Sequence, residues 1–104
     1  MKRAHLTPAA NREIAEAADW YEARQVGLSD RLFEEIDNAL ALIRRHPAAF
    51  PLLQDLPSDL HVRRALLDRF PYCLIFLELP SEIRIIAVSH LKRRPGYWLS
   101  RLGI

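Results

Sequence analysis

A histidine, three cations and two large aromatic residues lie within nine positions near the C-terminus, from His90 to Trp98. They follow an apolar run, residues 83–89, that predicts a buried β-strand. Cations beside aromatic rings are suited to binding phosphates, bases or acidic protein segments. An ordinary solvated C-terminal segment can have the same composition, so this stretch alone leaves both interpretations open.

Charge is distributed unevenly along the chain. Residues 1–60 contain seven Lys or Arg and ten Asp or Glu, a net charge of −3, whereas residues 61–104 contain eight and three, a net charge of +5. This asymmetry predicts an anionic partner for the C-terminal half. A net charge of +5 is nevertheless lower than a dedicated nucleic-acid-binding domain usually carries.

The overall composition predicts one globular domain over residues 1–104. No apolar run approaches the roughly 20 residues that span a membrane, and the basic N-terminus lacks the apolar segment of a secretory signal. The single cysteine, Cys73, has no partner for a disulfide or a structural zinc site. The three glycines are isolated, which excludes a glycine-rich phosphate loop. We therefore expect a cytoplasmic protein with no metal site and no cofactor.

The N-terminal half predicts a helical hairpin, preceded by a short edge strand at residues 2–6. Thr7 and Pro8 suit the start of a first, alanine-rich helix that ends before Gly27. A second helix should begin near Leu28 or Ser29, with Ser29 as its N-cap, and stop before Pro47. The apolar stripe of this second helix comprises Leu28, Leu32, Phe33, Ile36, Leu40 and Ile43.

The C-terminal half changes to the period of β-strands. After a connector at residues 48–59 that contains Pro51 and Pro57, strands are predicted at residues 61–67, 72–79 and 83–89, separated by short turns. The middle strand is apolar on both faces. Helices followed by strands predict an α+β fold, in which the hairpin packs on one face of a small antiparallel sheet and a short helix ends the chain.

This order of elements, with the residues that occupy it, resembles the RelE/ParE toxin family of bacterial type II toxin–antitoxin systems, and most closely its ParE-like, plasmid-stabilisation branch. The resemblance spans nearly the whole chain. It is carried by His90 and by residues 6–10 (LTPAA), 20–21 (WY), 46–50 (HPAAF), 62–67 (VRRALL), 69–72 (RFPY) and 93–98 (RRPGYW).

The resemblance implies a small cytoplasmic toxin that forms a hetero-oligomer with a cognate antitoxin encoded beside it. Antitoxins of this family wrap a flexible segment around the toxin, and Trp20 and Tyr21 are the expected contacts here. ParE-like toxins poison DNA gyrase, whereas RelE-like toxins cleave mRNA on the ribosome. The expected target- or phosphate-binding residues are Arg63, Arg64, Arg69, Lys92, Arg93, Arg94 and Trp98.

RNA cleavage by a 2′-hydroxyl needs a base, charge stabilisation at the phosphate and an acid. A nuclease could be assembled from Arg64, His90, Arg94 and Tyr97, although a permanently charged arginine cannot act as the base. The lysine-rich set of the ribonuclease branch is missing, since the only lysines are Lys2 and Lys92. We therefore expect a toxin that binds gyrase without catalysis. An mRNA endonuclease and a non-toxic binding module remain the alternatives, so enzyme activity stays open.

Several of these residues also have simpler structural interpretations. Arg64 either pairs with a helix carboxylate such as Glu35 or lines a groove. His90 could serve only to bond the backbone at the strand end. Tyr97 and Trp98 could pack on the sheet or helices instead of stacking on bases. Likewise, Trp20 and Tyr21 belong either to the core or to an apolar patch that the antitoxin covers.

Overall fold

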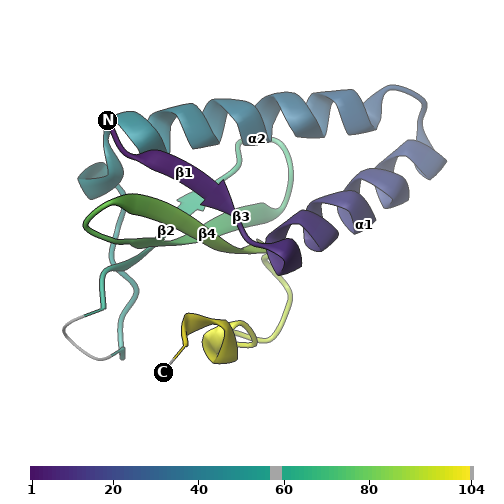
Figure 1. Ribbon diagram of the computed structural model, residues 1–104. Coiled ribbons are helices and arrows are strands. Elements are labelled where there is room, and N and C mark those ends of the chain that lie inside the picture. The colour runs from purple at the N-terminus through teal and green to yellow at the C-terminus, as the bar shows by residue number, and fades with distance from the viewer. Residues whose placement is uncertain (57–59, 104) are drawn as a thin grey trace.

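The computed structural model describes residues 1–56 and 60–103. The chain runs through β1 (Arg3–Leu6), α1 (Pro8–Arg24), α2 (Leu28–Arg45), the 3-10 helix η1 (Pro47–Ala49), β2 (Val62–Leu66), β3 (Tyr72–Glu78), β4 (Glu82–His90) and the 3-10 helix η2 (Leu99–Leu102). The four strands form one sheet in the order β1-β4-β3-β2, with the α1–α2 hairpin on one face and η2 on the other (Figure 1). The predicted α+β fold is confirmed.

The sheet is mixed, which differs from the antiparallel sheet expected for all its strands. Strands β2, β3 and β4 pair antiparallel as predicted, but β1 pairs parallel with β4, and its register joins Arg3 to Glu82 and Leu6 to Ile85. A parallel pair needs a long connection, and the two helices and two strands between β1 and β4 supply it. Alternation along a short strand reports which face is buried but carries no information on strand direction.

The start of α1 follows the predicted capping. The Thr7 hydroxyl oxygen accepts a hydrogen bond from the Ala10 amide at 3.2 Å, and Pro8 occupies the first turn, where its missing N–H costs nothing. Small residues then dominate the buried face, which consists of Ala10, Glu13, Ile14, Ala17 and Ala18. Glu13 is the one charged residue on that face.

Helix α2 begins at Leu28, as predicted, but its N-cap is Gly27 and not Ser29. The Glu22 carboxylate, near the end of α1, accepts hydrogen bonds from the backbone amides of Gly27 (2.9 Å) and Ser29 (3.0 Å) and from the Ser29 hydroxyl (2.7 Å). A carboxylate from the preceding helix thus accepts hydrogen bonds from backbone N–H groups that an N-cap side chain usually satisfies. Gly27 adopts φ +95°, which makes the tight turn into α2 accessible.

The buried stripe of α2 comprises Leu32, Ile36, Ala39 and Ile43. Phe33, expected to lie in the stripe, is instead 42% exposed. Its place in the buried stripe was therefore predicted wrongly, because position 33 lies roughly 100° around the helix from the buried Leu32.

Two apolar cores lie on opposite faces of the sheet. The first joins both helices to residues such as Leu74, Phe76 and Ile85, and the second contains Cys73 and Ile75. Strand β3 is therefore buried on both faces, as its apolar run predicted. The C-terminal segment, with Trp98 and Leu102, covers the second core, together with Leu53, Leu56 and Leu60.

The connector after α2 protects the outer edge of β2. The Leu53 amide donates to the Val62 carbonyl at 2.9 Å, and the Arg64 amide donates to the Pro51 carbonyl at 3.2 Å. The part of the predicted connector that includes Pro57 lies outside the described residues. Within the described ranges no helix is long and apolar enough to cross a membrane.

Candidate functional site

The C-terminal segment is fastened to α1 by one buried carboxylate. Glu13 Oε2 accepts a hydrogen bond from the Tyr97 hydroxyl at 2.6 Å, and the Arg101 guanidinium reaches both carboxylate oxygens at 2.9 and 3.1 Å. The Val88 amide of β4 donates to Glu13 Oε1 at 2.9 Å, and Arg93 approaches Oε2 at 3.4 Å. The two oxygens of Glu13 therefore join α1, β4 and the C-terminal segment.

This network fixes the protonation states of its members. Burial disfavours the charged form of Glu13, but hydrogen bonds from Arg101, Tyr97 and Val88 together outweigh it, so the pKa of Glu13 lies below its ordinary value. Burial and the hydrogen bond to Glu13 raise the pKa of Tyr97 to about 12. Glu13 is thus ionised and Tyr97 protonated at neutral pH, as a structural clamp requires.

A basic groove opens beside the clamp, on the face of the sheet opposite the helices. It has a volume of about 140 Å³, and four of the predicted site residues, Arg64, His90, Arg93 and Trp98, line it. Cys73 and Ile75 contribute to its lining from β3. Burial raises the pKa of the Cys73 thiol, which keeps it protonated at neutral pH. The groove therefore combines an apolar lining with arginine side chains suited to an anion.

The groove histidine is held in one tautomer. His90 Nδ1 accepts a hydrogen bond from the Lys92 amide at 3.0 Å, and its ring lies edge-on to Tyr72 with centroids 5.0 Å apart. Because Nδ1 accepts, the neutral ring carries its proton on Nε2. In this arrangement the other ring nitrogen of His90, Nε2, is a hydrogen-bond donor.

The other predicted binding residues lie apart from this groove. Arg63 is half-buried and donates to the Phe50 carbonyl at 2.7 Å, and its Nε lies 3.9 Å from Glu78, so it holds the connector in place. Arg69 is exposed beside α2, where it lines a different cavity. Lys92 and Arg94 are exposed and do not line the groove.

Trp98 and Arg64 resolve two alternatives that the sequence left open. Trp98 is only 6% exposed and packs in the second core, so its ring supports the groove and offers no stacking surface. Arg64 is exposed and lines the groove; the predicted pair with Glu35 does not form, because Glu35 accepts the amides of Asp68 and Arg69 at 3.0 and 3.1 Å.

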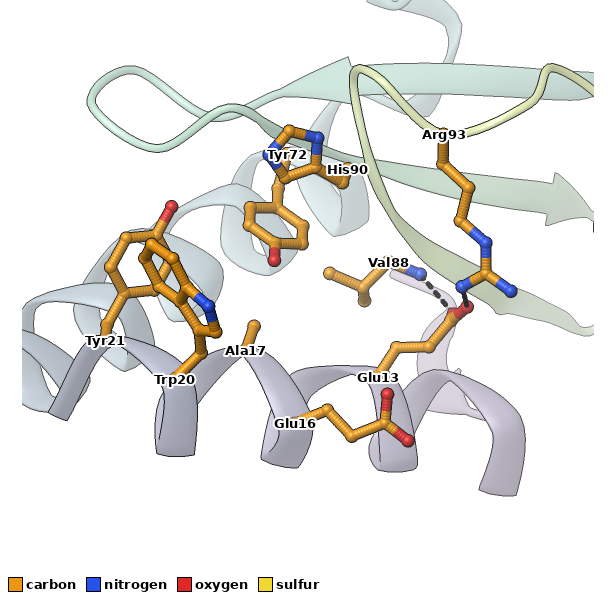
Figure 2. A pocket seen from close by; sticks show the side chains of 9 residues that line it. All are labelled: Glu13, Glu16, Ala17, Trp20, Tyr21, Tyr72, Val88, His90 and Arg93. Carbon is orange, nitrogen blue, oxygen red and sulfur yellow. Dashed lines mark hydrogen bonds and ion pairs between the residues drawn. The ribbon is translucent and has the colours of Figure 1, made fainter. Parts of the chain in front are cut away.

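A second cavity, here called the α1 pocket, lies between α1 and the ends of β3 and β4 (Figure 2). Its volume is about 400 Å³, and it is lined by Glu13, Glu16, Ala17, Trp20, Tyr21, Tyr72, Val88, His90 and Arg93. Trp20 is 51% exposed, whereas Tyr21 is half-buried against Phe70, with ring centroids 4.9 Å apart. His90 and Arg93 line both this pocket and the basic groove.

Glu13 was not predicted as a site residue, although the sequence carries a signal for it. Positions 10, 13, 14 and 17 share one face of α1 at helical spacing, and Glu13 is the only charged residue among three small or apolar ones. A carboxylate on a buried helix face needs cationic partners. Among the described residues no cluster of His, Cys, Asp and Glu could hold a metal ion.

The fold, a helical hairpin over a mixed four-stranded sheet, also occurs in a solved structure. A solved structure described as "Chromosomal ParDE TA system from P. aeruginosa" superposes with a TM-score of 0.72 at 16% sequence identity, covering 86% of this chain and 96% of that chain. A family model for the ParE toxin of the type II toxin–antitoxin system parDE matches residues 4–95. The chain therefore belongs to the ParE toxin family. Comparison with curated proteins gave no significant match.

Proposed function

We propose that this protein arrests growth by binding and poisoning DNA gyrase in the cytoplasm, and that a cognate antitoxin neutralises it in a hetero-oligomeric complex. Membership of the ParE toxin family supports a role as the toxin of a toxin–antitoxin system. The observation that carries the choice of gyrase over mRNA is that the Tyr97 hydroxyl is bonded to Glu13 and His90 Nδ1 to the Lys92 amide, while the other candidates are arginines.

Each candidate catalytic group is occupied or unsuitable. Tyr97 has a pKa of about 12, so it is protonated at neutral pH and cannot act as a base, and its hydroxyl proton is engaged by Glu13. His90 has its Nδ1 lone pair engaged by the Lys92 amide. Arg64 and Arg94 are permanently charged and can only stabilise an anion. The groove is therefore suited to holding an acidic surface of a target protein.

The expected antitoxin contact is supported by the exposure of α1. Trp20 exposes half of a large aromatic side chain beside the α1 pocket, while Tyr21 supports the pocket from the first core. Exposed aromatic surface next to a cavity is a common anchor point for a partner segment. Arg93 and His90 belong to both the pocket and the groove, so an antitoxin bound at the pocket would also alter the target-binding surface.

The decisive experiment is induction of the toxin followed by parallel measurement of plasmid supercoiling and mRNA integrity. We expect loss of supercoiling activity or trapped cleaved DNA, with transcripts intact, and the same inhibition of purified gyrase. Arg64→Ala should weaken the inhibition, whereas Arg44→Ala, which removes an equally exposed arginine at the end of α2, should not. Normal gyrase activity at an excess of toxin would contradict the proposal.

One observation favours the alternative function as an mRNA endonuclease. His90 lies in the same groove as Arg64 and Arg93. That function predicts discrete cuts in translated mRNA that disappear in His90→Ala and Tyr97→Phe. Growth arrest with intact transcripts would exclude it. Unaffected growth after expression without an antitoxin would instead indicate a binding module that is not toxic.

A further inference from the structure

The α1 pocket combines aromatic rings with carboxylates. Trp20, Tyr21 and Tyr72 provide the rings, and Glu13 and Glu16 provide the carboxylates. Glu13 is already bonded to Arg101, Tyr97 and Val88 and has no capacity for a ligand. Glu16 is exposed on α1 and makes no hydrogen bond or ion pair to any described residue. Among the described residues that line the pocket, Glu16 is thus the carboxylate free to pair with a cation, and Figure 2 shows it on α1 with its carboxylate turned away from the aromatic rings.

Within the chain, the Trp20 ring of this pocket and the Tyr97 ring outside it each lie against a guanidinium group. The Arg24 guanidinium lies 3.3 Å from the centre of the Trp20 ring, and the Arg93 guanidinium lies 3.7 Å from that of Tyr97. Both contacts have the geometry of cation–π interactions. Figure 2 shows the Tyr72 hydroxyl directed towards α1, near Ala17 and Trp20, where a cation entering from solvent would meet its oxygen.

The electrostatic environment of Tyr72 agrees with a cation-attracting pocket. Burial, the neighbouring Tyr21 and the negative charges of Glu13 and Glu16 raise the pKa of Tyr72. The carboxylate contributions to this shift favour a positive charge in the same place, whereas burial, its largest cause, disfavours an unpaired charge of either sign. The opposing cation, Arg93, is directed at Glu13, 3.4 Å away.

We propose that the α1 pocket receives an arginine or lysine side chain of the antitoxin, which replaces Arg24 against the Trp20 ring, lies beside Tyr72 and pairs with Glu16. The identity of the partner rests on the function proposed above, whereas the chemistry of the pocket does not. The antitoxin segment would then carry a basic residue where it crosses α1 and acidic residues where it reaches the basic groove. Charge alternation of this kind would fix the register of an otherwise flexible segment.

The pocket chemistry is tested with a small probe on the purified full-length chain. N-acetyl-arginine amide is titrated while the indole N–H resonances of Trp20 and Trp98 are followed by NMR, with N-acetyl-citrulline amide as an uncharged probe of the same shape. We expect the arginine probe to shift Trp20, leave the buried Trp98 unchanged and bind with a dissociation constant in the millimolar range, roughly that of a single contact.

Variants define the site. Glu16→Gln should weaken the arginine probe about three-fold, since exposed ion pairs are weak, and Tyr72→Leu should weaken it by a similar factor through loss of a ring. Asp19→Asn, which removes an exposed carboxylate on α1 outside the pocket, should leave binding unchanged. Equal binding of the citrulline probe, or an unchanged affinity in Glu16→Gln, would overturn the proposed cation site.

The partner is tested separately with the antitoxin encoded beside the toxin. Glu16→Lys should weaken the complex at least ten-fold, while toxicity in the absence of antitoxin stays at the wild-type level. Unchanged affinity would overturn the assignment of the pocket to the antitoxin even if the arginine probe binds. If wild-type toxin captures no antitoxin at all, both that assignment and the proposed neutralisation fail, and the probe titration still decides the pocket chemistry.

Discussion

The Tyr97 hydroxyl donates a 2.6 Å hydrogen bond to the Glu13 carboxylate, across 84 positions of sequence. The contact joins the first helix to the C-terminal segment and orders the Arg93 side chain that lines the basic groove. A binding surface formed by residues late in the chain therefore depends on a carboxylate in its first helix.

Glu13→Gln should destabilise the fold without changing side-chain shape. An amide cannot neutralise Arg101, which is three-quarters buried, and it cannot accept with both of its polar atoms. We expect a loss of about 2–4 kcal/mol in the free energy of unfolding, measured by urea denaturation. Asp19→Asn, an exposed change of the same type on α1, is the control. Equal stability of the two variants would mean that the clamp contributes nothing.

Tyr97→Phe removes one hydrogen bond and leaves the contacts of Arg101 with Glu13 intact. The expected cost is about 1–2 kcal/mol, because the lost bond is charge-assisted and partly buried. If the role of Tyr97 is structural, toxicity per folded molecule should persist at a temperature where the variant is folded. Abolished toxicity in a variant with native circular dichroism would assign Tyr97 to the chemistry instead.

Acid should weaken the fold through Glu13. Its pKa in the folded state lies below the ordinary value of 4.5, so its stabilising contribution is complete above about pH 4.5 and is lost as the pH falls through the lower, folded-state pKa. The difference in unfolding free energy between wild type and Glu13→Gln should shrink over that acidic range. Because Glu22 titrates in both proteins, its contribution cancels in this difference. A difference independent of pH would contradict the ionised clamp.

Alkali should weaken the fold through Tyr97. Its pKa rises from 10.0 to about 12 on folding, so its contribution is complete below pH 10 and is lost as the pH rises towards 12. Tyr21, Tyr72 and Cys73 also have raised pKa values and act in the same direction. Tyr97→Phe should therefore reduce, but not remove, the loss of stability above pH 10, which pH-dependent thermal unfolding would measure.

Local patterns predicted much of the fold. The cap at Thr7 depends on residues close together in the sequence, so it could be predicted. The strands β2 and β3 could be predicted because the spacing and the composition of their residues indicate which positions are buried. The parallel direction of β1 could not be read this way, because it depends on where α1 packs against β4, far along the chain.

The candidate site was predicted only in part, for the same reason. Arg64, His90 and Arg93 do meet in one groove, but Trp98 is buried beneath it and Tyr97 is held by Glu13. Basic and aromatic residue types indicate a segment that can bind an anion. They do not indicate which of these side chains are buried in the core and which are exposed for binding. That distinction depends on tertiary contacts between the ends of the chain.

The Glu22 cap gives a further prediction, since the start of α2 depends on a side chain from α1. Glu22→Ala leaves the amides of Gly27 and Ser29 without this acceptor, and α2 should fray at its first turn. We expect a lower Tm, by less than in Glu13→Gln, together with faster amide exchange at residues 27–31. Glu34→Ala, an exposed change on α2 with no such bonds, should leave both unchanged. Unaltered exchange in Glu22→Ala would show that Gly27 alone sets the helix start.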